Sequence, residues 1–211
     1  MKFGKGVLSK IPQNGCGKRY LSQFIAVMDI KAIAQALGMA IFRYPALWRK
    51  LHHEPASNDG SMLRNYAVPI IALVQLLKFP LIGEPRPAMF LGIVSMLVDS
   101  AVLYVLAGGV LALLPIPRTE EAKGQVMTVF CYALTPCWLA ELAYGHGVWS
   151  ILIALFALLH ALASSREGLV RLLSLEVQSA SGALTRSAFF MVLISSISFF
   201  ILSAATLLVS F

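Results

Sequence analysis

Charged residues are scarce in this sequence. Asp, Glu, Lys and Arg make up 13% of its 211 residues, whereas 58% of the residues are hydrophobic. A soluble domain of this length ordinarily carries about 25% charged residues. Because so few charges cannot keep the surface of such a chain in water, the composition excludes an ordinary soluble globular protein. It predicts that most of the chain lies in lipid.

Cysteine is also scarce, and the familiar catalytic motifs are missing. The three cysteines, Cys16, Cys131 and Cys137, do not form the even-numbered set of a disulfide framework. On a helix, Cys131 and Cys137 would lie about 9 Å apart along the axis and about 240° apart around it, so they cannot jointly bind one ion. The sequence also has no HExxH, no phosphate-binding Gly-rich loop and no Ser-His-Asp constellation. We therefore predict no enzyme activity, no metal site and no cofactor.

The N-terminal segment lacks the apolar core that follows the charges of a secretory signal, so we expect a retained basic arm. The formal net charge is +7. A basic segment beside a bilayer marks its cytoplasmic side and attracts anionic lipid headgroups. No nucleic-acid-binding signature accompanies the charge, so we expect no nucleic-acid partner. Ten of the 17 Lys and Arg residues precede the first strongly apolar stretch: Lys2, Lys5, Lys10, Lys18, Arg19, Lys31, Arg43, Arg49, Lys50 and Arg64.

Long apolar runs, in contrast, are abundant. A helix needs roughly 17–25 apolar residues to cross a bilayer. The sequence therefore predicts an all-α fold, a polytopic membrane bundle of five transmembrane helices. The five predicted spans are Tyr66–Gly83, Ala88–Leu114, Val126–Tyr144, Val148–Ala163 and Ala188–Phe211.

The cations set the expected orientation of these spans. With the N-terminus inside, the ten cations above and five more lie on the inner side, Arg86 alone lies outside, and Lys78 lies within a span. This bias predicts a cytoplasmic N-terminus and an outside C-terminus, in a bacterial cytoplasmic (inner) membrane. The five further inner cations are Arg118, Lys123, Arg166, Arg171 and Arg186.

Residues 20–42 are apolar but interrupted by Asp29, Lys31 and Gln35, which favours an N-terminal interfacial helix partly buried against the bundle. A second interfacial piece is predicted at Arg166–Val177. The organisation is then a basic cytoplasmic arm (1–19), a cytoplasmic or interfacial helical region with a linker (20–65), and a five-span membrane domain (66–211). After the first interfacial helix we expect a headgroup anchor of Arg43, Trp48, Arg49 and Lys50.

Three ionisable residues lie inside the predicted spans: Lys78, Asp99 and Glu141. Such groups are costly in lipid, so they face the bundle interior, pair with each other or line water. Lys78 and Glu141 lie at similar depth near the outer ends of their spans and can pair, with Asp99 within reach of the lysine. Two interpretations stay open, a structural ion pair that snorkels to the interface and a functional polar cavity or proton relay.

Two further features concern packing. Pro136 removes a backbone hydrogen bond in the middle of the third span and predicts a kink there, with Thr135 or a neighbouring helix as partner for the freed carbonyl. Gly108 and Gly109 on the second span permit close approach of another helix, either within the bundle or at a dimer surface.

Three stretches carry a resemblance to a known family: FRYPALW (42–48), NYAVPIIAL (65–73) and VFCYALTPCWLAEL (129–142). Together with the five spans, they resemble the Ypt-interacting protein (Yip) family of small multi-span membrane proteins, bacterial type, from about Phe42 to Val170. The resemblance implies a non-enzymatic integral membrane protein. Eukaryotic members of that family associate with small Rab-type GTPases and act in vesicle transport.

Three functional hypotheses follow. The first is a membrane scaffold or partner-recruiting protein of the Yip-like type, with a protein partner or a second copy of itself as binding partner. The second is a transporter or channel component that works through Lys78, Asp99 and Glu141. The third is an accessory subunit of a larger membrane complex that holds pigment or lipid.

Overall fold

A computed structural model describes residues 30–53, 63–143 and 148–209 of the chain. The basic arm at 1–19, the first part of the interfacial segment at 20–29, most of the linker and the predicted end of the third span at Tyr144 lie outside the described residues. Every element in the described ranges is helical. Two short helices come first, α2 (Ile30–Phe42) and α3 (Tyr44–His53).

Five long apolar helical segments follow, and they confirm the predicted five-span all-α fold. The segments long and apolar enough to cross a membrane are Leu63–Ile82, Pro85–Leu113, Glu120–Ala143, Val148–Leu172 and Ala180–Thr206. The protein is therefore a multi-pass integral membrane protein. The elements that build the spans are η1 (Leu63–Ala67), α4 (Val68–Ile82), α5 (Pro85–Leu113), α6 (Glu120–Ala133), α7 (Thr135–Ala140), η2 (Glu141–Ala143), α8 (Val148–Leu172) and α9 (Val177–Val209).

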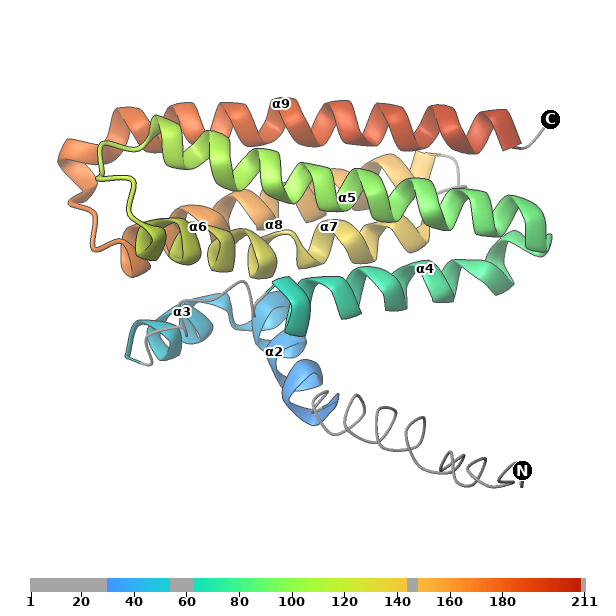
Figure 1. Ribbon diagram of the computed structural model, residues 1–211, viewed down its shortest axis with the longest axis horizontal. Coiled ribbons are helices and arrows are strands. Elements are labelled where there is room, and N and C mark those ends of the chain that lie inside the picture. The colour runs from blue at the N-terminus through green and yellow to red at the C-terminus, as the bar shows by residue number, and fades with distance from the viewer. Residues whose placement is uncertain (1–29, 54–62, 144–147, 210–211) are drawn as a thin grey trace, which may run out of the picture.

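The long helices run side by side along one axis (Figure 1). Helix α9 lies along α5, α4 covers another side of α5, and α8 packs against α6 and α7. The most completely buried large side chains come from several spans, among them Phe130, Ile71, Leu103 and Leu106. In contrast, large apolar side chains on the outer faces of α4, α5, α8 and α9 are exposed, as lipid-facing side chains are.

The two glycines of the second span differ in their surroundings. A Cβ added at Gly109 would overlap the ring of Phe190 on α9, so Gly109 permits the close approach of α5 and α9 within the bundle. Gly108 is exposed and has open space beside it.

The structure differs from the prediction of a second interfacial piece at Arg166–Val177. Helix α8 continues without a break to Leu172, and α9 begins at Val177. The end of α8 is amphipathic because it leaves the hydrocarbon: Gly168 and Leu169 are buried against the bundle, whereas Arg171 donates to Glu167 on the outside over 2.9 Å. Glu167 and Arg171 therefore lie at the end of the fourth span and not on a separate interfacial helix.

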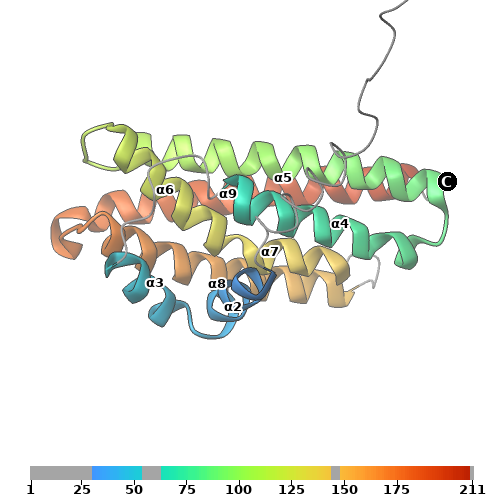
Figure 2. The same cartoon turned by 60° about the horizontal axis from the view of Figure 1, so that its bottom comes forward.

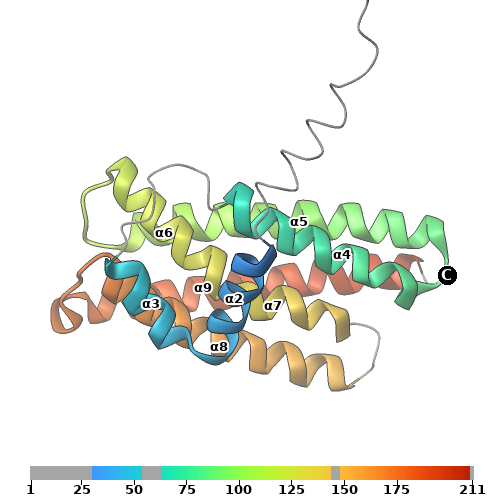
Figure 3. The same cartoon turned by 90° about the horizontal axis from the view of Figure 1, so that it is seen from below.

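Helices α2 and α3 lie against one side of the bundle, across α7 and α8 (Figures 2 and 3). The described apolar part of α2, Ile33–Phe42, has 10 residues, fewer than a helix needs to span a bilayer. Its carbonyl at Ala40 lies 3.0 Å from Nε2 of His160, which is about midway along α8. The end of α2 therefore lies beside the middle of α8, whereas an interfacial helix was expected near the end of the bundle.

Candidate functional site

The third span is interrupted. Helix α6 ends at Ala133, Leu134 adopts φ −80° and ψ −8°, and α7 begins at Thr135 with Pro136 in its first turn. Pro136 has no N–H to continue the α6 ladder, and proline is best tolerated in the first turn of a helix. The chain therefore ends one helix at Ala133 and starts another at Thr135, one residue before the proline for which a kink was predicted.

Side chains satisfy the backbone at this break. The hydroxyl of Thr135 donates to the carbonyl of Cys131 over 3.2 Å, and the hydroxyl of Tyr66 lies 3.1 Å from the same threonine oxygen. Tyr66 in turn stacks on Tyr132, with ring centroids 4.4 Å apart. The break is thus held from the first span, and α7 is fixed as a separate short helix that carries its own side chains toward the bundle interior.

The last turn of this interrupted span places Glu141 beside the other two predicted ionisable residues. Lys78 of α4 forms an ion pair with Glu141, and its ammonium lies 3.5 Å from the hydroxyl of Ser95 on α5. Gln75, one turn before Lys78, donates to the same carboxylate over 3.2 Å. The structure thus assembles one polar cluster from α4, α5 and the end of the third span, which we call the acid–lysine cluster: Gln75, Lys78, Ser95, Asp99 and Glu141.

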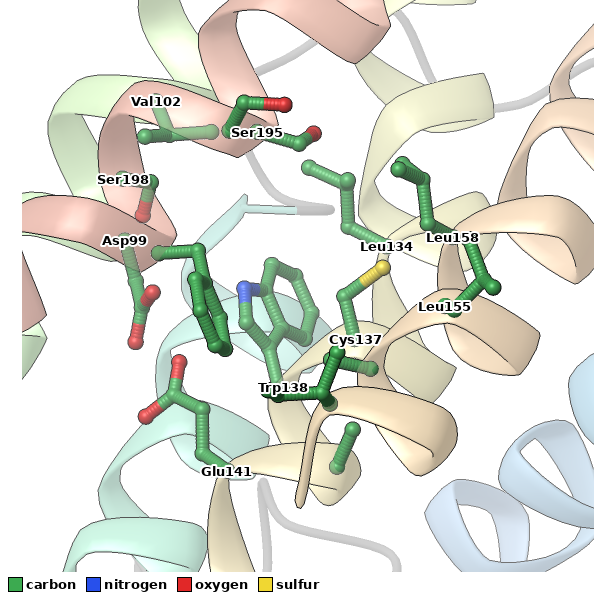
Figure 4. A pocket seen from close by; sticks show the side chains of 15 residues that line it. Asp99, Val102, Leu134, Cys137, Trp138, Glu141, Leu155, Leu158, Ser195 and Ser198 are labelled. Atoms are coloured by element: carbon green, nitrogen blue, oxygen red, sulfur yellow. The ribbon is translucent and has the colours of Figure 1, made fainter. Parts of the chain in front are cut away.

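Asp99 belongs to this cluster through Glu141. The carboxyl groups of Asp99 and Glu141 turn toward one another (Figure 4) and are within hydrogen-bonding reach. Both residues are only 4% exposed. The cluster therefore buries two carboxyl groups against a single ammonium group, and a hydrogen bond between the two carboxyl groups requires that one of them carry a proton.

Asp99 and Glu141 also form the polar side of a pocket of about 290 Å³ between α5, α7, α8 and α9. Leu155 and Leu158 from α8 form an apolar wall on the side away from the two acids, and Trp138 from α7 lies between (Figure 4). Three serines of α9 complete the lining: Ser195, Ser196 and Ser198. A concave apolar pocket with a few convergent polar groups is the usual form of a small-molecule site.

Two buried polar atoms on this pocket have no hydrogen-bond partner in the described part of the chain: Oδ2 of Asp99 and Oγ of Ser195. Buried polar groups in proteins are nearly always hydrogen-bonded, and each exception calls for an explanation. Asp99 and Ser195 both line the pocket, but these two atoms have almost no accessible surface, so they lie beneath the pocket wall.

Sequence reasoning identified the three charges but missed Gln75, Ser95 and the α9 serines. A helical-spacing signal was available for two of them, since Gln75 precedes Lys78 by three residues and Ser95 precedes Asp99 by four, and such pairs share a helix face. The serines of α9 carried no comparable signal, because serine is common in membrane helices as a packing residue.

The two cysteines of the third span have different surroundings. Cys131 is buried in the core, whereas Cys137 lines the pocket. Among the residues the structure describes, no group of three or more His, Cys, Asp or Glu side chains is placed to hold a metal ion.

At the predicted headgroup anchor the structure differs from the prediction for one residue. Arg43, Arg49 and Lys50 are exposed, as an interfacial role requires. Trp48 is 0% exposed; its indole donates to Ser164 of α8 over 3.3 Å. The indole faces the bundle because α3 is amphipathic, with Trp48 on the same face as the buried Leu47 and Leu51.

No family model, curated protein or solved structure matches this chain. The resemblance to the Yip family therefore stays a prediction.

Proposed function

We propose that the protein is a membrane transport component that binds a cationic solute at the acid–lysine cluster and moves it through the bundle. One observation carries this proposal: Asp99 is a second buried carboxyl group beside the ion pair, it lines a pocket, and its Oδ2 has no hydrogen-bond partner among the described residues. An ion pair that served only to join two helices would have no use for this second carboxyl group. Ionisable residues within membrane spans that face a cavity are typical of substrate and ion pathways.

The interrupted third span supports the same proposal. Transporters commonly build their binding sites from discontinuous helices, because the break frees backbone and gives the two halves separate freedom to move. Here α7 and η2 carry Cys137, Trp138 and Glu141 on the pocket side of the break. A tilt of α7 about Leu134 would change the pocket while α6 stays packed.

The test is cation-driven current in proteoliposomes. The purified full chain is reconstituted, and currents are recorded after jumps in proton, sodium, potassium and alkylammonium concentration. We expect a current with at least one of these cations, and its loss in Asp99→Asn and Glu141→Gln. Ser187→Ala is the matched control, because Ser187 is a buried serine of α9 that lines a different pocket. No current with any of these cations, or equal currents in Asp99→Asn and wild type, would refute the proposal.

A second candidate function rests on α3. Arg43 directly before this helix and Arg49 and Lys50 within it are exposed, so this segment can bind anionic headgroups while Trp48 fixes it to the bundle. This favours the scaffold hypothesis, in which the surface recruits lipid or a protein partner. Replacing the three cations with glutamine is expected to reduce retention of anionic lipid on purification, with each charge contributing about 1 kcal/mol. Unchanged lipid retention would count against it.

We also propose the orientation. The end of the bundle that carries Arg118, Lys123 and Arg171 faces the cytoplasm, whereas Arg86 lies at the opposite end, at the start of α5. A membrane-impermeant thiol reagent is then expected to label Cys16 only in inverted vesicles, since Cys131 is buried. Labelling of Cys16 in right-side-out vesicles would reverse the proposed topology.

A further inference from the structure

Two pockets follow one another between α8 and α9. The pocket of about 290 Å³ beside the acid–lysine cluster is lined on α8 by side chains within residues 151–158. A second pocket, of about 210 Å³, begins one helical turn farther along α8 and is lined there by side chains within residues 162–169. On α9 the lining passes in the same order, from residues 195–199 to residues 184–191. We call the two pockets together the α8–α9 groove.

The α8–α9 groove is open to hydrocarbon along its side. On its α8 rim, Leu155 is 51% exposed and Ala163 is also exposed, and both lie within the apolar span Val148–Leu172. The floor of the second pocket is apolar and buried, with Phe130 of α6 and Met191 of α9 among its side chains. Empty space beside such side chains forfeits dispersion contacts. Within a bilayer, the molecules that can fill the groove from this side are lipid chains.

One end of the groove carries a cation. Arg166 is the one charged side chain among the described residues that line the second pocket, and it is exposed at the rim. It lies near the end of the fourth span, where an arginine extends its guanidinium to the level of the lipid headgroups. The neighbouring acid, Glu167, pairs with Arg171. The groove therefore matches a ligand with an anionic head and an apolar chain, because a guanidinium binds phosphate with two parallel hydrogen bonds.

The length of the groove fits one lipid chain. From residue 155 to residue 166, α8 advances by eleven residues, which is about 16 Å at a rise of about 1.5 Å per residue. This is about half of the roughly 30 Å thickness of the hydrocarbon layer, the depth of one leaflet. A chain that starts at Arg166 therefore ends beside Leu155 and Leu158, on the side of the first pocket away from the two acids (Figure 4).

The groove is separate from the cationic surface at α3. Trp48 of α3 donates to Ser164 of α8, and its indole lies against Gly168. Ser164 and Gly168 are each two residues from Arg166, which places them about 200° around the helix from it. Helix α3 and the groove therefore occupy opposite faces of α8.

We propose that the α8–α9 groove holds one phospholipid with a net negative head, its phosphate bound by Arg166 and one acyl chain lying along the groove as far as Leu155. Basic pockets between membrane helices are common sites for anionic headgroups. The lipid fills the space between α8 and α9 and is not required to contact the carboxyl groups of the acid–lysine cluster, so the proposal does not rest on transport. A zwitterionic lipid would fit the same groove but would bring Arg166 no net opposite charge.

Tryptophan fluorescence tests this proposal, because Trp138 lines the first pocket, where the chain ends. Trp149 is 69% exposed and would be quenched by any brominated lipid, so the full chain carries Trp149→Phe. Trp48 is 0% exposed on the α3 side and contributes a constant background. The protein is placed in phosphatidylcholine nanodiscs, and increasing fractions of the lipid are replaced by lipid brominated near the chain end. The brominated lipid has either a phosphatidylglycerol or a phosphatidylcholine head.

We expect the quenching to give an exchange constant of about five in favour of phosphatidylglycerol, the preference that one basic residue near a membrane surface provides. Arg166→Gln should bring this constant to about one. Arg186→Gln is the matched control and should keep the preference, because Arg186 is an exposed cation of α9 two residues from Leu184 of the lining and faces away from the groove. The comparison of the two heads needs no change at Arg166, so it decides even if Arg166→Gln does not fold.

An exchange constant of one in the chain with Arg166 intact would overturn the anionic head. No quenching of Trp138 when every lipid is brominated would overturn the position of the chain. Equal loss of preference in Arg166→Gln and Arg186→Gln would overturn the assignment to Arg166. Inorganic phosphate in excess, at constant ionic strength, should leave the quenching unchanged; reversal by phosphate would identify a site for the free anion and overturn the lipid.

Discussion

Removing the lysine of the acid–lysine cluster should destabilise the protein far more than removing either acid. Lys78→Met keeps the length of the side chain but takes away the cation that pairs with Glu141, a residue only 4% exposed. Loss of one partner from a buried ion pair costs about 3 to 5 kcal/mol, because the other charge is left uncompensated in a low dielectric. We expect a cost in that range here, since Glu141 loses its counter-charge and keeps a second acid, Asp99, beside it.

Removing an acid has a different consequence. In Glu141→Gln, Lys78 keeps Asp99 as a nearby carboxylate, and Gln75 keeps an amide oxygen as acceptor, so the cost should be about 1 to 2 kcal/mol from the weaker hydrogen bonds. In Asp99→Asn the cluster becomes one cation with one anion. We expect no loss of stability there, or a small gain.

Reversible unfolding in mixed micelles, by titration with a denaturing detergent, measures these free energies of unfolding. Lys123→Met serves as the control, because that lysine pairs with Glu120 on the exposed start of α6 at 3.5 Å and should change stability by less than about 0.5 kcal/mol. Equal loss of stability in Lys78→Met and in Glu141→Gln or Asp99→Asn would refute this prediction, because the charge left uncompensated by removal of the lysine would then have no energetic consequence.

Three further predictions concern the scaffold around the cluster. Gly168→Ala should cost about 1 to 3 kcal/mol in unfolding free energy, because the new Cβ would lie 3.0 Å from the indole of Trp48. Gly182→Ala is the control: a Cβ there would have nothing within 4 Å, so the change should be neutral or stabilising. Thr135→Val should cost about 1 to 2 kcal/mol, since it leaves the hydroxyl of Tyr66 unpartnered, and Thr135→Ser should restore most of the loss. Pro136→Ala should keep stability within about 1 kcal/mol but lower cation-driven current, because a continuous helix would redirect the end of the span.

The fold was predictable because the length of an apolar run is enough to identify a membrane-spanning helix. Within hydrocarbon, a chain must satisfy its backbone internally, so an apolar run of sufficient length is a helix whatever its neighbours are. Helix ends were less predictable. The fourth span was expected to end at Ala163, where charges begin, but α8 continues to Leu172 because its charged turns still bury Gly168 and Leu169. A change from apolar to amphipathic pattern does not end a helix.

The cluster was predictable in part for the same reason. A charge within a span is too costly to leave in lipid, so three such residues at related depths are expected to meet. The side of the bundle on which they meet depends on helix rotation, which hydropathy does not encode. Trp48 illustrates this: a tryptophan beside basic residues suits a headgroup anchor, but the rotation of α3 turns its indole inward onto α8. The pocket could not be predicted either, because it depends on how α8 and α9 are spaced.

The energetics of the cluster bear on function in their own right. A protein that needed only to join α4 to the third span would be served best by Lys78 and Glu141 alone, with an apolar residue in place of Asp99. Instead, Asp99 adds a second buried acid, lies one helical turn from Ser95 and lines a pocket, with no hydrogen-bond partner for its Oδ2 among the described residues. Natural proteins tolerate such destabilising groups chiefly where activity requires them. The expected separation, in which Asp99→Asn abolishes cation-driven current without lowering stability, follows from this, because the second buried acid is not needed for the ion pair between Lys78 and Glu141.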